Sequence, residues 1–466
     1  MTSTSEISDR LRGAGLSDSA IAAWTRAEPS ATADYATDRR RHSEFWAHSR
    51  ALLECLPKKQ SRNASEAAAA RLLLETARAS RERFLTAHAA TVYDALTDNR
   101  SRFVRLDELM LAAAAAISGL VPAPEELARE GAERQGDKDG LEVDHGIFLA
   151  QVLGREQSGL HLCHAMLLPR TDSVACLKDF SARGKIDLGP VRMERQGKAI
   201  HMTTSNPRVL NAEDDTTLEA MEMAVDVAIL DSESELVVMR GDIVEHRKYA
   251  GRHVLGSGIN LTRLYHGKIP FLWLIERDMG FVHKILRGVA VPGVLPDDVA
   301  GSGIEKPWVA VLETFAVGGH CQLLLTVDYT IAASDGLITL PARKEGFIPG
   351  AANLRLPRFT GDRIARQAIQ YGRELPCDSP EGLLLCDEVV APEAIDDAIA
   401  RVSANLTSAG LVSFIANRRC FRVSEEPLDL FRRYMATYAR EQAACHFSDA
   451  LISNLERNWN AKNRTP

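Results

Sequence analysis

Two glycine-rich segments, Leu255–Leu261 and Ala316–Gln322, are the strongest candidates for chemistry in this sequence. Glycine allows the backbone to approach a ligand closely and to adopt positive φ angles. Each segment stands between a strand-like and a helix-like stretch, so the two turns can direct two backbone N–H groups at one oxygen atom. An ordinary strand-to-helix turn has the same pattern. Each segment alone therefore indicates little, and the surrounding elements decide its interpretation.

The elements that must position these turns alternate between strand and helix. Ala199–Thr204, Leu236–Met239 and Trp308–Leu312 read as short strands, and Leu218–Ile229 repeats apolar residues at helical spacing. This alternation predicts an α/β core that begins near Met193.

Helix dominates both ends of the chain. Ala64–Leu96 contains no Gly or Pro and repeats apolar residues at a spacing of three to four. Val143–Leu168 and Pro427–Trp459 also read as helix. We therefore expect three regions: a helical N-terminal domain (1–192), an α/β core (193–405) and a C-terminal helical region (406–466).

The composition excludes several classes of function. The chain has 466 residues and a net charge of −7, so it has no global basic field to hold nucleic acid or anionic lipid. Its longest apolar run, Leu109–Ile117, is far shorter than the roughly 20 residues that span a bilayer. The polar start, Met1–Asp9, does not resemble a signal peptide. None of the eight cysteines forms a C-x-x-C pair, which favours a reduced, cytoplasmic protein.

Five segments around the two turns follow the order found in one family. They resemble its N-R-P-x-x-x-N-A segment, its first oxyanion turn, its K-P-V-I-A-A-V-N-G-x-x-x-G-G-G-x-E segment, its G-x-x-P-G segment and its closing helical stretch. In this chain they are Ser205–Ala212, Leu236–Gly241 with Gly256–Asn260, Lys306–Val311 with Val317–Gln322, Gly346–Gly350 and Gly361–Val390. On these segments the chain resembles the crotonase (enoyl-CoA hydratase) superfamily. The resemblance implies an α/β fold with a core of ββα turns arranged as a spiral.

The resemblance also implies a substrate and a site. The backbone N–H groups of Ile259 and Gly319 would hold the thioester oxygen of an acyl-CoA and stabilise its enolate, and each such donor is typically worth about 10²–10³ in rate. The CoA would lie along two short segments, Arg208, Val209, Leu210 and His253, Val254, Leu255, Gly256, Ser257, Gly258.

Two departures from the family pattern bear on the reaction. Hydratases of this family carry two catalytic glutamates, and the matching residues here are Gln322 and Ala342. A glutamine accepts no proton at neutral pH, and an alanine has no acid–base chemistry. Addition of water by two carboxylates is therefore not expected, although the enolate-stabilising turns are kept.

An insertion between the two turns supplies further candidates. Pro270–Arg277 and Phe281–Val289 form an apolar segment that we place beside the acyl pocket. Arg277, Glu213 and Gln322 are our candidates for anchoring the aryl group of a substrate or an oxygen intermediate, although Arg277 in a surface ion pair is an equal alternative. Which group takes the α-proton does not follow from the sequence.

The helical N-terminal region and the insertions narrow the resemblance to one branch, the cofactor-independent dioxygenases of 3,5-dihydroxyphenylacetyl-CoA in glycopeptide (vancomycin-type) antibiotic biosynthesis. This implies conversion of the arylacetyl-CoA and O₂ to 3,5-dihydroxyphenylglyoxylate and CoA, without a metal or organic cofactor. A dry pocket would hold O₂, and Leu261 and Ile348 are its candidates. The C-terminal helices would pack across a homotrimer or a dimer of trimers.

Two other functions remain open at this point. The same turns suit a crotonase-like thioesterase or isomerase, and loss of both glutamates suits an acyl-CoA-binding scaffold without activity. The intact pair of turns argues against the scaffold.

Two histidine groups imitate metal sites. His42, Glu44 and His48 copy the pattern of a non-haem iron oxygenase, but they lie in an Arg-rich helical stretch, so we expect a solvated helix face. His161 and His164 lack further ligands at zinc spacing, and we expect them in a core or an interface.

Overall fold

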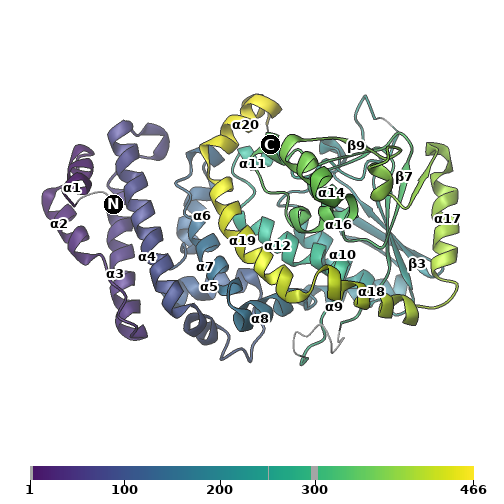
Figure 1. Ribbon diagram of the computed structural model, residues 1–466, viewed down its shortest axis with the longest axis horizontal. Helices are drawn as coiled ribbons and strands as arrows, with labels where there is room; N and C mark the ends of the chain where they lie inside the picture. Colours follow the sequence, from purple (N-terminus) through teal and green to yellow (C-terminus); the bar gives the residue numbers. More distant parts are fainter. Residues whose placement is uncertain (1–3, 250, 295–302, 466) are drawn as a thin grey trace. The chain divides into compact units, whose positions relative to one another are not determined.

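The computed structural model describes residues 4–249, 251–294 and 303–465. Contacts divide the chain into two compact units, both drawn in Figure 1. The first unit comprises Met1–Leu162, Pro270–Leu272 and Met435–Asp449, and the second comprises Cys163–Ile269, Trp273–Tyr434 and Ala450–Pro466. The three regions expected from the sequence, 1–192, 193–405 and 406–466, stay a prediction.

Most of the first unit is helical. Its helices include α1 (Thr4–Gly13), α2 (Asp18–Ala27), α3 (Tyr35–Glu54), α4 (Ala64–Leu96), α5 (Leu106–Ala116), α6 (Pro124–Gly131) and α7 (Val143–Leu153), and α8 (Glu156–Leu167) runs on into the second unit. The predicted helix Ala64–Leu96 is confirmed, and a capping box between Asn63 and Glu66 starts it. The stretch Val143–Leu168 is two helices instead of one, because α7 ends at Gly154.

A seven-stranded sheet forms the centre of the second unit. Its order is β1-β2-β3-β4-β5-β7-β10; β1, β2 and β3 pair antiparallel, and the pairs from β3 to β10 are parallel. The strands are β1 (Lys185–Asp187), β2 (Val191–Gln196), β3 (Ala199–Thr204), β4 (Leu236–Gly241), β5 (Trp308–Leu312), β7 (Tyr329–Ala333) and β10 (Glu388–Val390). The sheet begins earlier than expected, since β1 and β2 precede the predicted first strand.

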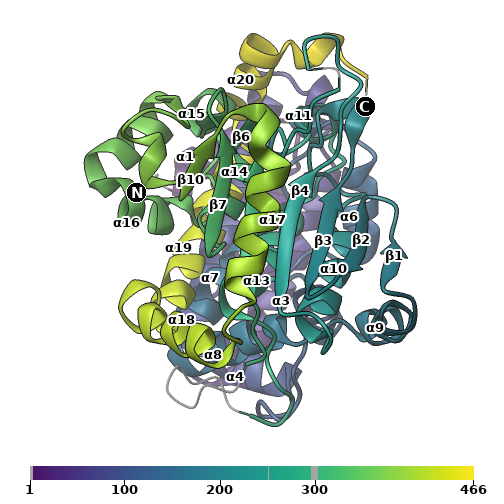
Figure 2. The same ribbon diagram turned by 90° about the vertical axis from the view of Figure 1, so that its right-hand side faces the viewer.

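Helices cover both faces of this sheet. Val237, Met239 and Trp308 face the core that contains α10 (Leu218–Leu230), and Val238 and Val309 face α17 (Ile395–Leu406). Figure 2 shows α17 in front of the strands. Burial on both faces explains why the parallel strands read as continuous apolar runs.

The elements that hold the second turn form a smaller layer. A three-stranded sheet joins β6 (Phe315–Val317), β8 (Leu337–Thr339) and β9 (Leu375–Pro376). The helix α14 (Gly319–Leu324) follows β6 after one residue, so the turn lies where strand becomes helix.

The end of the chain is helical, as predicted. It contains α18 (Val412–Glu425), α19 (Leu428–His446) and α20 (Asp449–Trp459), and α16 (Ala352–Arg366) lies earlier in the chain. A buried ion pair joins Arg355 to Glu426, with N–O distances of 2.8 and 2.9 Å. In the described part of the chain, every helix is too short or too polar to cross a membrane.

The insertion between the turns folds as two helices, α12 (Phe271–Met279) and α13 (Phe281–Arg287). The Lys284 side chain on α13 is fully buried and binds Glu222 at 2.8 Å and Asp226 at 2.6 Å on α10. Burial raises the Asp226 pKa, although the Lys284 charge opposes this. The cluster therefore holds α13 against α10 through charges that have little access to water.

We expect Lys284→Met to lower the free energy of unfolding by about 3–5 kcal/mol, because it removes the buried cation that lies closest to two buried carboxylates. Urea unfolding of the purified variant measures this loss. Lys198→Met is the control, since Lys198 is 56% exposed in its ion pair with Glu235 and its removal should cost at most about 1 kcal/mol. Equal stability of the two variants would contradict this assignment.

Candidate active site

The first glycine turn is fixed by the main chain of Glu213. The Glu213 N–H donates to Gly258 O at 2.8 Å, and the Asn260 N–H donates to Glu213 O at 2.8 Å. Because a trans peptide is planar, its N–H points opposite to its C=O. The Gly258 carbonyl faces Glu213, so the Ile259 N–H points away from it. This orientation frees the Ile259 N–H for an external acceptor.

The second turn presents its N–H at a helix start. The Gly318 N–H donates to Thr339 O at 2.9 Å, and the Gln322 N–H donates to Gly318 O at 3.2 Å. The Gly319 N–H is one of the first amides of α14, which have no acceptor within their own helix. Gly318 has φ +53°, which favours glycine.

The two turns touch each other. The Val317 N–H donates to Gly256 O at 3.1 Å. A Cβ atom added to Gly258 would lie 3.0 Å from Val317 O and 3.4 Å from Gly319 N. The main chain that carries Ile259 therefore lies against the one that carries Gly319, as two donors to one oxygen require.

Two asparagines shape the loop before Glu213. Leu210 and Asn211 both have positive φ, 57° and 55°. The Asn211 side chain accepts from the Asn206 N–H at 2.9 Å and donates to Val254 O at 2.8 Å, while Asn206 Nδ2 donates to Ala212 O at 2.9 Å. These bonds stabilise a backbone that ordinarily costs energy outside glycine. They explain the spacing of the two asparagines in Ser205–Ala212.

The Arg277 guanidinium forms the centre of the site. Its Nε and Nη2 donate to the Glu213 carboxylate, and Nη2 also donates to Gly319 O at 2.8 Å. Its Nη1 donates to Asp278 Oδ1 at 3.0 Å and to Gln322 Oε1 at 2.9 Å. All five N–H groups of an arginine are thereby used. Arg277 is 2% exposed, so a surface ion pair is excluded.

Burial and charge shift the pKa values of the two carboxyl groups of this cluster, Glu213 and Asp278, in opposite directions. Burial is the largest influence on Glu213 and raises its pKa, but the charge and hydrogen bond of Arg277 together with His320 outweigh it, and the net pKa is lowered. For Asp278 burial outweighs the Arg277 charge, so its pKa is raised. Glu213 is therefore the anion that matches Arg277. Asp278 was not predicted from the sequence, where its only signal is an acidic residue next to Arg277 in an apolar segment.

The arginine also sets the direction of the Gln322 amide. Its Oε1 accepts from Arg277, so the Nε2 group points away from the guanidinium. Within the described residues, no hydrogen-bond partner is found for this Nε2. The Gly350 main chain packs against the oxygens of Gln322 and Asp278. A Cβ atom on Gly350, which has φ +45°, would lie 2.3 Å from Gln322 Oε1 and 2.5 Å from Asp278 Oδ2.

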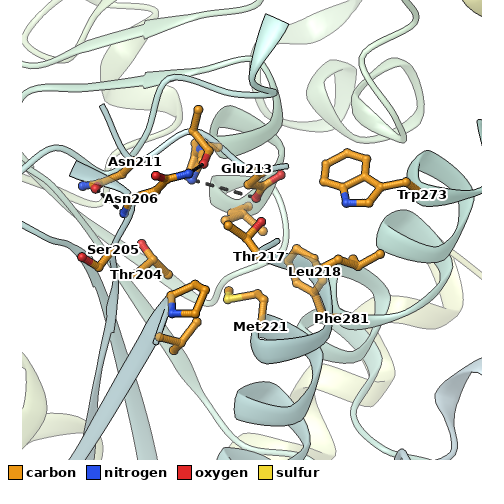
Figure 3. A pocket seen from close by; sticks show the side chains of 15 residues that line it. Thr204, Ser205, Asn206, Asn211, Glu213, Thr217, Leu218, Met221, Trp273 and Phe281 are labelled. Atoms are coloured by element: carbon orange, nitrogen blue, oxygen red, sulfur yellow. Dashed lines mark hydrogen bonds and ion pairs between the residues drawn. The ribbon is translucent and has the colours of Figure 1, made fainter. Parts of the chain in front are cut away.

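A small, partly open pocket lies beside Glu213. Figure 3 shows Leu218 and Met221 below the carboxylate, Trp273 and Phe281 to one side, and Asn206 and Asn211 to the other. Its walls are mostly apolar at one end. The buried Thr204 hydroxyl also lines it and has no hydrogen-bond partner among the residues that the structure describes.

The nine candidate CoA residues lie in two adjoining segments. The Ser257 N–H donates to Leu210 O at 3.1 Å and its hydroxyl to Val209 O at 3.0 Å, which joins the segments. Arg208 is exposed, and His253 Nδ1 contacts Gly241 O at 2.8 Å. Val254 and Leu255 are buried, and the Val254 N–H donates to Asp242 O at 3.2 Å while its carbonyl accepts from Asn211.

The other candidate positions are less closely defined. Leu261 starts α11 (Leu261–Tyr265) and packs into the core, while Ile348 is half-buried in the loop after α15 (Ala342–Glu345). Their common role in an O₂ pocket stays a prediction. Ala342 is buried, so the second hydratase carboxylate position is filled by a methyl group.

The metal-like histidines have structural partners. His42 is buried against Ser80, with 2.8 Å between Nδ1 and Oγ, and not solvated as expected, because its ring packs near Trp46 and Phe84. His161 contacts the Tyr93 hydroxyl at 2.8 Å. No group of three or more His, Cys, Asp or Glu side chains suited to a metal occurs in the described ranges. All eight cysteines are free.

Comparison with known proteins shows the family to which this chain belongs. A family model described as enoyl-CoA hydratase/isomerase matches residues 300–425. The chain is 44% identical over 393 residues to the (3,5-dihydroxyphenyl)acetyl-CoA 1,2-dioxygenase of Amycolatopsis orientalis, covering 84% of this chain and 89% of that protein. The chain belongs to the crotonase superfamily. The resemblance carried by the five segments is thus confirmed, together with the α/β fold and its helical ends.

More distant crotonases match a smaller part of the chain. The short-chain-enoyl-CoA hydratase of Clostridium acetobutylicum is 25% identical over 226 residues, 48% of this chain and 77% of that protein. A solved enoyl-CoA hydratase/isomerase from Xanthobacter autotrophicus Py2 is 18% identical, with a TM-score of 0.48, and covers 59% of this chain and 96% of its own.

We expect Ile259→Pro to lower turnover at least about 10²-fold, because proline removes the N–H that the first turn presents. Ile259→Val is the matched control; it keeps the N–H and should stay within several-fold of the wild type. Circular dichroism establishes that both variants are folded. Full turnover in a folded Pro variant would place the oxyanion donors elsewhere.

Proposed function

We propose that this protein is a dioxygenase that converts 3,5-dihydroxyphenylacetyl-CoA and O₂ to 3,5-dihydroxyphenylglyoxylate and CoA. The 44% identity to a dioxygenase of that substrate, over 84% of the chain, carries the proposal. The two adjoining turns support it, because their N–H groups suit a thioester oxygen that becomes an enolate. The site residues named from the sequence meet around one arginine, which supports a common role.

The reaction balances without a further reactant. Loss of one α-proton gives an enolate whose charge the Ile259 and Gly319 N–H groups stabilise. The enolate reduces O₂ and forms a peroxide at the α-carbon. The distal peroxide oxygen attacks the thioester carbonyl and expels the CoA thiolate. Cleavage of the O–O bond with loss of the second α-proton leaves one atom of O₂ on the α-carbon, as a ketone, and the other on the former thioester carbon, as a carboxylate. The CoA thiolate takes up one proton.

The cluster around Arg277 suits the aryl end of such a substrate. The Glu213 carboxylate accepts hydrogen bonds from phenolic hydroxyls, and the Gln322 Nε2 group donates to a phenolic or peroxide oxygen. A neutral amide performs this without adding charge near the enolate. We assign anchoring of the substrate to these two side chains and orientation of both to Arg277.

A thioesterase or isomerase on the same turns is the alternative. Hydration of the kind that needs two carboxylates is disfavoured, because positions 322 and 342 carry a glutamine and an alanine. The Asp278 carboxylate does not replace these two carboxylates, because it is hydrogen-bonded to Arg277. A scaffold without activity is disfavoured by the two N–H groups that the turns leave open. We further propose that the protein works in the cytoplasm as a homotrimer or dimer of trimers, without a metal or organic cofactor.

The test is O₂ consumption with release of CoA by protein treated with a chelator. We expect 3,5-dihydroxyphenylacetyl-CoA to give one thiol per O₂ consumed, and a rate that added iron does not raise. Thiol release without O₂ uptake would favour the thioesterase. Activity that disappears with chelator and returns with iron would refute the cofactor-free reaction.

We expect Gln322→Glu to slow oxygenation and to release CoA out of step with O₂ consumption. A carboxylate here would be the third around Arg277, and its charge would oppose the enolate and bring water into the site. Binding of an unreactive substrate analogue should stay largely intact. Parallel electrode and thiol assays measure the coupling. Wild-type rate and coupling would exclude Gln322 from the reaction.

A further inference from the structure

His320 links the two glycine turns. It follows Gly319 on α14, and its Nδ1 lies 3.1 Å from the Gly258 N–H of the first turn. The ring lies against the main chain, because a Cβ on Gly256 would be 2.2 Å from its Cε1 and Nε2. One side chain next to the second donor therefore contacts both glycines of the first turn.

The hydrogen bond fixes the protonation of the ring. The Gly258 N–H is a donor, so Nδ1 must accept, and a neutral ring then carries its hydrogen on Nε2. This nitrogen faces Glu213 Oε1 at 3.9 Å. Burial, with the Arg277 charge, lowers the His320 pKa to about 4 against the pull of Glu213. The ring is therefore neutral at pH 7 and able to accept.

We propose that His320 is a positioning residue, whose Nδ1 accepts from the Gly258 N–H and holds the Ser257–Gly258 peptide, so that the adjoining Gly258–Ile259 peptide presents the Ile259 N–H to the same oxygen as the Gly319 N–H. The peptide before Ile259 is held on its carbonyl side by the Glu213 N–H, and His320 holds the preceding N–H. Without this acceptor, the buried Gly258 N–H has no partner. Rotation of the Ser257–Gly258 peptide toward another acceptor would then turn the Ile259 N–H away from the oxygen that the Gly319 N–H contacts. This inference rests on the proposed enolate chemistry.

The matched pair His320→Leu and His320→Asn tests the acceptor. Leucine and asparagine have similar size, but only the Asn Oδ1 can replace Nδ1 as an acceptor. We expect His320→Leu to lower kcat about 10–100-fold, as loss of alignment in an oxyanion site does, with little change in binding of an unreactive CoA thioether analogue. His320→Asn should recover most of this loss.

Exchange of the substrate α-hydrogens with D₂O under nitrogen provides a readout that does not need O₂. We expect exchange to fall in the Leu variant and to return in the Asn variant, in parallel with kcat. Equal loss in both variants would show that the ring acts by packing alone, and wild-type exchange in a folded Leu variant would also overturn the proposal. If the wild type exchanges α-hydrogens without consuming O₂, the dioxygenase assignment fails while the role of His320 is still tested.

Discussion

The site depends on one buried guanidinium with all of its donors occupied. Arg277 binds the Glu213 carboxylate from one part of the chain and, from α14, the Gly319 carbonyl and the Gln322 amide. Placing a charge at this depth is costly unless it is paired and fully hydrogen-bonded. The insertion that carries Arg277 therefore fits only when the loop at Glu213 and the start of α14 are both in place. Formation of the cation site and of the second turn is one event.

This constraint accounts for what the family pattern changes and what it keeps. Hydratases place a carboxylate at the Gln322 position, and here that position accepts a hydrogen bond from Arg277. The nearby carboxylate of Glu213 is paired with the same arginine, and the methyl group of Ala342 fills the second carboxylate position. The two turns that we propose to bind the thioester oxygen are unaffected because they would use main-chain groups, which side-chain replacement leaves in place.

Much of this was predictable from sequence, for identifiable reasons. The glycine turns and the paired asparagines match segments of the family, so the resemblance implied the two proposed donors. Glu213 and Arg277 were candidates for anchoring the substrate, Arg277 as a cation in an apolar segment. Asp278 and His320 were not singled out, because their importance comes from burial and from neighbours distant in sequence. The strand β2 was missed since only Val191 and Met193 alternate with polar residues there, too short a pattern to distinguish from a loop. The burial of His42 likewise depends on α4, which packs over it.

Glu213 acts through two independent parts of itself. Its main chain orients the first turn, and its side chain holds the arginine. Replacement of the side chain leaves the amide and the carbonyl in position, so a mutational scan reports only half of what this residue does. The main-chain hydrogen bonds of Glu213 are not tested by substitution with another natural amino acid. They become accessible only when the backbone itself is altered, as by an ester in place of the amide, which deletes the N–H and spares the carboxylate.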